Sequence, residues 1–115
     1  IPGPSALASL ISVSGSKHKE IMFTGFLSKK DGKQRKELLA LKEWKGTIII
    51  YESPYRIKKT LHRIKDVFPE AQLTIGREMT KKFEEILYIA CNELDDEEID
   101  SITDRGEFAI AIIQP

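Results

Sequence analysis

The sequence has a single cysteine, two histidines and no long hydrophobic run. Cys91 has no second cysteine to pair with, and one cysteine with two histidines makes a poor metal site. No apolar stretch approaches the roughly 20 residues that a membrane-spanning helix needs, and we expect no signal peptide. We therefore expect a cytoplasmic protein with no metal site and no membrane association, in which Cys91 is a buried structural thiol.

Net charge is also lacking, because 18 Lys and Arg balance 18 Asp and Glu. The balance hides an asymmetry. Residues 17–65 carry 14 Lys and Arg against 5 Asp and Glu, whereas residues 66–115 carry 4 against 13. Such asymmetry indicates either an anionic partner for one part of the surface or pairing between the two halves. Charge alone leaves both interpretations open.

The length of 115 residues, with 41% hydrophobic and 31% charged residues, is typical of one globular domain. The first residue is Ile1, and the uncharged, turn-prone stretch "IPGPSA" follows directly from it. We therefore expect the chain to be part of a longer protein.

Hydrophobic periodicity predicts an α/β fold with a mixed five-stranded sheet flanked by helices. Strands are expected at 21–26, 47–51, 72–77, 85–91 and 108–113. Four helices are expected. The first runs from about residue 6 to 15, the second follows a polar loop at 27–36 and ends at Gly46, and the third spans 57–68. The fourth is a short acidic helix that Asn92 caps. The third and fourth strands are expected to pair as a hairpin. The fifth is expected to be central because it is apolar throughout.

Polar residues follow several of these strands. In "YESPYR", Ser53 and Pro54 have the residue types of a helix cap and a first helical position, so an amino-terminal helix end is expected at the sheet edge, ready for an anion. The alternative interpretation of these residues is an ordinary helix start with no ligand, in which Glu52 is solvated. The turns "GREMTKK" and "DRGEF" are each typical of ion-pair networks. Together with "IPGPSA" they predict turns that converge on one edge.

The stretches "IPGPSA", "FTGFL", "YESPYR", "REMTKKFEE" and "RGEF" together resemble a known family, in order and over nearly the whole chain. They are similar to the carboxyl-terminal half of bacterial enzymes that methylate a ribose 2′-hydroxyl in 16S ribosomal RNA, within the tetrapyrrole methylase superfamily. The family commonly has His where this chain has Tyr55, Leu where it has Met79, and Pro-Arg where it has Ser28 and Lys29.

The resemblance implies that residues 1–115 are the carboxyl-terminal domain of a two-domain, usually dimeric methyltransferase whose amino-terminal domain is absent here. S-adenosyl-L-methionine would lie between the domains, so this part alone is expected to be inactive. By the same resemblance, the cofactor-binding residues are Pro2, Gly3, Ser5, Ala6, Tyr51, Arg77, Glu78, Thr80 and Gly106.

The charge asymmetry then predicts a surface for ribosomal RNA or the small ribosomal subunit. Its residues are Lys29, Lys30, Lys33, Arg35, Lys36, Arg56, Lys59 and Arg63. Phe26 and Tyr55 are candidates for stacking on an extruded base, although core packing is the first expectation for Phe26.

Methyl transfer needs alignment, exclusion of water and an acceptor for the hydroxyl proton. Glu52 and Glu78 are the candidate bases, with Lys81 or Arg56 as neighbours, and the sequence does not choose between them. Two other functions stay open. One is methylation of a tetrapyrrole or another small molecule, and the other is a non-catalytic module for RNA binding or dimerisation.

Overall fold

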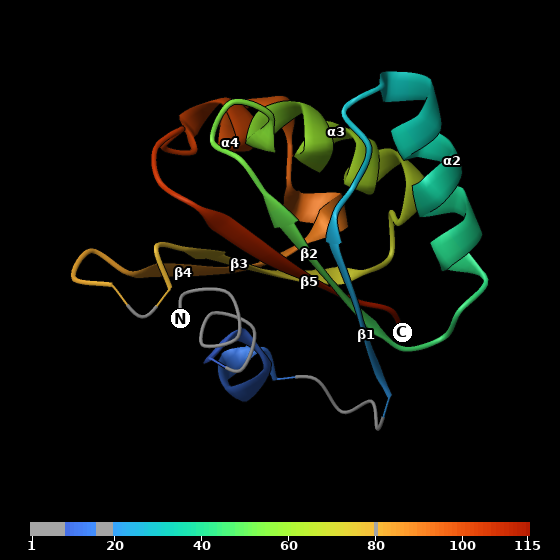
Figure 1. The fold of residues 1–115 in the computed structure, drawn as a ribbon, viewed down its shortest axis with the longest axis horizontal. Coiled ribbons are helices and arrows are strands. Elements are labelled where there is room, and N and C mark those ends of the chain that lie inside the picture. Colours follow the sequence, from blue (N-terminus) through green and yellow to red (C-terminus); the bar gives the residue numbers. More distant parts are fainter. Residues whose placement is uncertain (1–8, 16–19, 80) are drawn as a thin grey trace.

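The computed structural model describes residues 9–15, 20–79 and 81–115, and a mixed five-stranded sheet lies at its centre (Figure 1). The strands lie side by side in the order β1-β2-β5-β3-β4. Their bounds are β1 (Ile21–Phe26), β2 (Thr47–Glu52), β3 (Gln72–Arg77), β4 (Glu85–Ala90) and β5 (Phe108–Ile113). The predicted fold class, the hairpin of β3 with β4 and the central place of β5 are confirmed.

Both faces of the central strands are covered. In β2, Ile48 and Ile50 point into the main core, whereas Ile49 points into a smaller cluster on the opposite face. All three side chains are fully buried. A β-branched run without polar alternation is typical of a strand packed on both sides, so the sequence of β2 matches its place.

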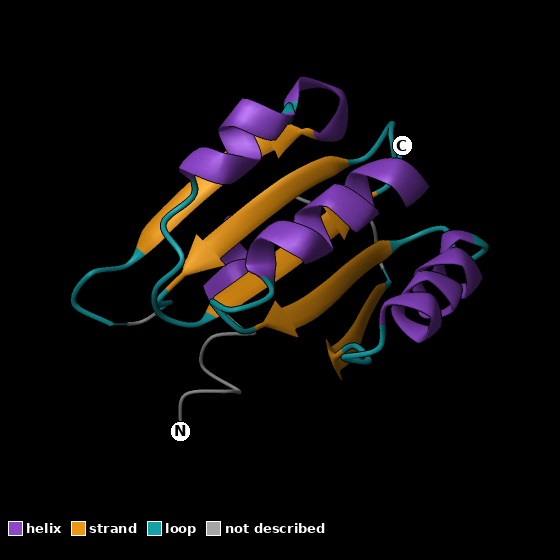
Figure 2. Cartoon of the chain, turned by 90° about the horizontal axis from the view of Figure 1, so that it is seen from above, coloured by secondary structure: helices purple, strands orange, loops and turns teal. Residues whose placement is uncertain are grey.

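Three helices cover one face of the sheet: α2 (Asp31–Lys42), α3 (Ile57–Val67) and α4 (Asp96–Ser101) (Figures 1 and 2). α3 turns Ile57, Leu61 and Ile64 into the main core, as its helical spacing predicts. A 3-10 turn at Cys91–Glu93 precedes α4. On the other face residues 9–13 are helical, and Leu10 packs there in the smaller cluster.

Three predicted helix starts are wrong. α2 begins at Asp31, so Asp31 and Gly32 form its first turn and the polar loop ends at Lys30. α4 begins at Asp96, and its cap is Asp95, which accepts a hydrogen bond from the Glu98 N–H at 2.8 Å. Asn92 lies in the preceding 3-10 turn instead.

The third misplaced start concerns the "YESPYR" stretch. α3 begins at Ile57 with Arg56 at its N-cap, and residues 54–56 form a turn in which the Arg56 N–H donates to the Ser53 carbonyl at 3.2 Å. Ser53 therefore does not cap the helix and Pro54 is not its first residue. The cause is Glu52, whose carboxylate takes the Ser53 N–H at 2.8 Å and holds the chain in a turn before the helix begins.

The strand directions bring several chain turns to one edge of the sheet. β1 runs parallel to β2, and β5 runs antiparallel to both β2 and β3. The carboxyl ends of β1, β2 and β3 therefore lie beside the amino end of β5, where Phe108 pairs with both Glu52 and Arg77. The predicted convergence is confirmed for "YESP", "REM" and "RGEF". "IPGPSA" and Thr80 lie outside the described residues.

Among the residues that the structure describes, no helix has the length and apolar character to cross a membrane. Cys91 is fully buried beneath α3, as predicted. Burial raises the pKa of its thiol from 9.0 to about 11, although the positive charge of Lys65 acts in the opposite direction.

This thiol provides a test of the core. Because a buried, protonated thiol is a poor nucleophile, we expect native protein at pH 8 to react with a thiol reagent at least about a hundred-fold more slowly than protein unfolded in urea. The folded state holds the proton more tightly than the unfolded chain, so the contribution of Cys91 to stability should be lost as the pH rises from 9.0 towards about 11. Equal labelling rates in the native and unfolded protein would contradict this placement.

Candidate functional site

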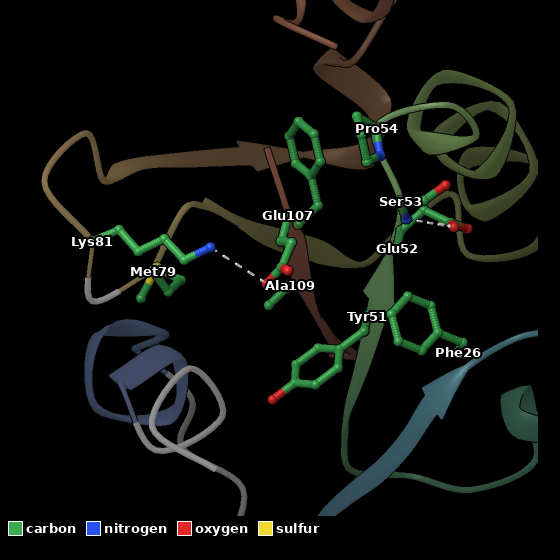
Figure 3. A pocket seen from close by; sticks show the side chains of 10 residues that line it. Phe26, Tyr51, Glu52, Ser53, Pro54, Met79, Lys81, Glu107 and Ala109 are labelled. Carbon is green, nitrogen blue, oxygen red and sulfur yellow. Dashed lines mark hydrogen bonds and ion pairs between the residues drawn. The ribbon is translucent and has the colours of Figure 1, made fainter. Parts of the chain in front are cut away.

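An open hollow of about 250 Å³ lies at the edge where the strands end. We call it the strand-end hollow. Its walls come from the ends of β1 and β2, the loop after β3 and the start of β5. Figure 3 shows Tyr51 and Phe26 at one side and Met79 and Lys81 at the other, with Glu107 and Ala109 between them. The lining residues are Phe26, Tyr51, Glu52, Ser53, Pro54, Met79, Lys81, Glu107, Phe108 and Ala109.

Small and flexible residues form the floor of the strand-end hollow. Ala109 faces the same side of the sheet as Met79, and both belong to the smaller apolar cluster with Leu10. Met79 folds back over Gly76 so closely that a β-carbon there would lie 2.5 Å from its sulfur. Gly76 therefore leaves the space that the Met79 side chain occupies.

Glu52 is 1% exposed, and four donors surround its carboxylate. Oε1 accepts from the Ser53 N–H at 2.8 Å and from Arg56 Nε at 3.2 Å. Oε2 accepts from Arg56 Nη2 at 3.1 Å and from Thr60 Oγ1 at 2.5 Å. A buried carboxylate needs such partners, so Glu52 braces the turn that forms one wall of the hollow.

The hydrogen bonds of Glu52 continue towards α2. Thr60 also accepts from Gln34 Nε2 at 3.2 Å, and Gln34 Oε1 accepts from Arg63 Nη1 at 2.6 Å. Arg63 lies 3.5 Å from Asp31 as well. This chain of contacts ties the end of β2 and the two helices α2 and α3 to one another beneath the surface of the protein.

The loop after β3 is held by a second set of contacts. Glu78 has a φ of +52°, an uncommon conformation for a non-glycine residue. Its N–H donates to the Glu107 carbonyl at 2.9 Å, and its carboxylate lies 3.0 Å from Lys81 Nζ. Gly106, with a φ of +78°, leaves the space that this carboxylate fills, since a β-carbon there would lie 2.5 Å from Oε1.

Lys81 stays charged in this setting. The hydrogen bond from its ammonium to Glu78 is the main cause that raises its pKa, and the negative charge of Glu107, 3.8 Å away, adds to the effect. Lys81 and Glu107 thus place one positive and one negative group at the mouth of the strand-end hollow.

The predicted cofactor residues divide into four groups. Tyr51 lines the hollow. Glu78 and Gly106 do not line it, but their mutual packing positions the loop that carries Met79 and Lys81. Arg77 turns to the opposite face of the sheet, where it contacts Glu85 and donates to the Arg105 carbonyl at 3.2 Å. The remaining predicted residues, Pro2, Gly3, Ser5, Ala6 and Thr80, lie outside the described part of the chain.

The predicted RNA-binding residues also divide. Arg56 and Arg63 have side chains 21% and 20% exposed and are engaged with Glu52 and with Gln34 and Asp31. The other six are exposed at the start of α2, just before it and on α3: Lys29, Lys30, Lys33, Arg35, Lys36 and Lys59. The basic surface predicted from the sequence therefore exists, and two of its arginines are internal braces.

Sequence reasoning missed part of the apolar lining, namely Phe108 and Ala109, and it expected Phe26 in the core although Phe26 is 65% exposed. One signal was available. The small residues Ala109 and Ala111 alternate with large ones in β5, which marks a face where another group approaches closely. Among the residues that the structure describes, no group of three or more His, Cys, Asp or Glu side chains is placed to hold a metal ion.

No family model matches the chain, but curated proteins do. It is 43% identical over 90 residues to the ribosomal RNA small subunit methyltransferase I of Leptospira biflexa, a match that covers 78% of this chain and 38% of that protein. It is 33% identical over 116 residues to the protein of the same name from Bacillus subtilis, covering 97% of this chain and 38% of that protein. The chain is a homologue of these methyltransferases. It spans about two fifths of the length of these two relatives, 38% in each case.

Solved structures share the fold. The cobalamin biosynthetic enzyme cobalt precorrin-4 methyltransferase CbiF superposes with a TM-score of 0.61 at 15% identity, over 93% of this chain and 48% of that one. The methyltransferase CobJ gives a TM-score of 0.64 at 14% identity, over 94% and 46%. The chain therefore shares the fold of these two methyltransferases, as the sequence resemblance implied.

Glu52 provides a test of the site's construction. Replacing Glu52 by Ala leaves Arg56 and Thr60 without their buried partner, so we expect Glu52→Ala to lower the free energy of unfolding by about 2 to 4 kcal/mol in urea denaturation. Glu70→Ala, which removes an exposed carboxylate, is the matched control and should change it by less than about 0.5 kcal/mol. Similar unfolding midpoints for the two variants would show that the Glu52 contacts do not stabilise the fold.

Proposed function

We propose that this chain is the carboxyl-terminal domain of a two-domain, S-adenosylmethionine-dependent enzyme that methylates a ribose 2′-hydroxyl of small-subunit ribosomal RNA. The observation that carries the proposal is a hollow at the strand ends beside an exposed basic surface, in a chain homologous to ribosomal RNA small subunit methyltransferase I. The strand-end hollow is one wall of the cofactor cleft. The other wall belongs to the rest of the protein.

The lining of the hollow suits S-adenosylmethionine. Its floor, with Met79 and Ala109, is apolar, and the Tyr51 ring offers a face to a cation such as a sulfonium. Lys81 can pair with a carboxylate and Glu107 with an ammonium group, and both charges lie at the mouth. When bound, the cofactor supplies a methyl group on a positively charged sulfur.

The chain's own residues align the reactants and exclude water. Both tasks lower the barrier to a transfer that needs little other chemistry. Of the two carboxylates predicted as bases, Glu52 has both oxygens engaged by donors. Glu78 is ion-paired with Lys81 at 3.0 Å, packs against Gly106 and does not line the hollow, so neither carboxylate is assigned as the acceptor of the hydroxyl proton.

RNA is preferred over a small tetrapyrrole as substrate. The solved structures named above share the fold at 15% and 14% identity, so they do not distinguish substrates. The exposed lysines of α2, such as Lys33 and Lys36, suit a phosphate backbone, and the two methyltransferase I relatives are 43% and 33% identical. A non-catalytic module would need none of the charged groups at the mouth of the hollow.

Such an enzyme acts in the cytoplasm, where ribosomal subunits are assembled, and we include the homodimer expected from the resemblance in this proposal. The edge strand β4 exposes Leu87 and Tyr88, which are 38% and 58% accessible. An exposed apolar edge is compatible with association of two copies.

The direct test uses the full-length protein, S-adenosylmethionine labelled in its methyl group, and small ribosomal subunits from cells that lack the enzyme. We expect label to enter the small-subunit RNA on ribose. A 2′-O-methyl group blocks alkaline cleavage of the adjoining phosphodiester, so the label should be recovered in an alkali-resistant dinucleotide. Label recovered on a base, or no transfer of label at all, would overturn the proposal.

A second test concerns the basic surface. Lys30→Glu together with Arg35→Glu, in the full-length enzyme, should weaken affinity for the small subunit. The slope of log K against log salt should fall by about one for each phosphate that the protein no longer neutralises. Affinity for S-adenosylmethionine, measured by calorimetry, should not change.

The matched control is Lys42→Glu with Lys45→Glu, because these exposed lysines lie at and just beyond the far end of α2. The control should leave the salt slope intact. Equal loss of subunit affinity in the two double variants would contradict the assigned surface.

A further inference from the structure

A β-bulge turns Phe26 out of the core. The pairing of β1 with β2 shifts between Phe23 and Gly25, and Gly25 has a φ of +71°. In a regular strand, residues three apart point to opposite faces. The extra residue places Phe23 and Phe26 on the same face instead, where both rings contact Tyr51 edge-on, with centroids 4.9 Å and 5.8 Å away.

Phe26 therefore stands at the rim of the strand-end hollow and forms part of a second one. This second hollow, the rim hollow, shares Phe26, Glu52 and Ser53 with the first. Its remaining lining comes from Leu27, Lys29, Tyr55 and Arg56. Phe26 is 65% exposed and Tyr55 is 94% exposed, so two aromatic rings of one hollow are largely uncovered.

The rim hollow continues into a charged one. A third hollow, the basic hollow, shares Lys29, Tyr55 and Arg56 with the rim hollow and adds Lys59 at the start of α3. Asp31, Gln34 and Thr60 complete it. From the strand-end hollow outward, the surface thus presents two aromatic rings and then two exposed lysines, Lys29 and Lys59.

We propose that the rim hollow is the subsite for one unstacked base of the RNA substrate, held by Phe26 and Tyr55, with neighbouring phosphates at Lys29 and Lys59. This inference deepens the proposed function and rests on it. Proteins that read single-stranded RNA stack its bases on aromatic side chains and hold its backbone with cations. Here the rings lie next to the hollow in which the methyl group would be supplied.

An alternative occupant is an apolar surface of the rest of the protein. The two lysines beside the rings favour RNA, because a protein surface that covered them would have to supply carboxylates to match. The two occupants give different results for stability, which the experiment below measures together with binding.

The experiment compares Phe26→Ala, Tyr55→Ala and Tyr55→Phe in the full-length enzyme. Loss of one aromatic stacking partner should weaken affinity for a single-stranded RNA spanning the methylated site, and for the small subunit, by roughly five-fold to 150-fold. Tyr55→Phe keeps the ring and should retain affinity within about two-fold. In the alanine variants the salt slope of binding should not change, because no charge is lost. Lys29→Ala with Lys59→Ala should reduce that slope instead.

The control is Leu39→Ala, which removes an exposed apolar side chain, 45% accessible, from α2. It should leave RNA affinity, S-adenosylmethionine affinity and thermal stability unchanged. Unchanged RNA affinity in both alanine variants would overturn the subsite. So would a fall in melting temperature of several degrees in Tyr55→Ala, because that ring is 94% exposed in this structure and would then be packing against another part of the protein.

Failure of the proposed function has a different signature. An unmodified enzyme that binds RNA through Phe26 and Tyr55 but transfers no methyl group would refute the methyltransferase and keep the subsite. If the unmodified enzyme transfers methyl to the small subunit and the alanine variants have the same kcat/KM, the methyltransferase function would stand and the subsite would be refuted. An unmodified enzyme that binds no RNA would overturn both.

Discussion

The carboxylate of Glu52 imposes the constraint on which the site depends. A charged group at 1% exposure is stable only with donors around it, and Ser53, Arg56 and Thr60 supply them. Meeting that requirement fixes the turn after β2 and the point at which α3 begins. The turn forms a wall of the strand-end hollow and of the rim hollow, so both take their shape from one buried charge. Through Thr60 and Gln34 the same constraint reaches α2 and its exposed lysines.

The two faces of the sheet have different tasks. Large aliphatic side chains fill the face under α2, α3 and α4, where Ile48 and Ile110 are fully buried. The opposite face has small residues at its centre, Ala109 and Ala111, with Gly76 beside them. Small residues let another group approach the backbone closely. One face therefore stabilises the fold, and the other supplies the floor of the site.

The sequence predicted the sheet better than it predicted the turns. The β-branched run of β2 and the helical spacing of α3 are patterns made by several buried residues in each element. Because many residues contribute to each pattern, it predicts the element well. A cap signal depends on a single residue, and many residues of the same type do not cap a helix. Ser53 and Asn92 were therefore misassigned as caps. The bulge at Gly25 turns the Phe26 side chain to the other face of the sheet. A bulge leaves little trace in the hydrophobic pattern, so Phe26 was expected in the core. The convergence of the strand ends was predictable, whereas the side chains that meet there depend on those turns.

The place of β5 bears on how the protein forms as it is made. β2 and β3 pair with β5 and not with each other, and β5 is the last of the five strands along the chain. During synthesis, the parallel pair β1 and β2 and the hairpin of β3 and β4 can each assemble early, but they stay separate until residues 108–113 leave the ribosome. The sheet then closes by insertion of an apolar strand between two waiting halves. Until that moment the inner edges of both halves are unpaired, and the newborn chain is most exposed to aggregation.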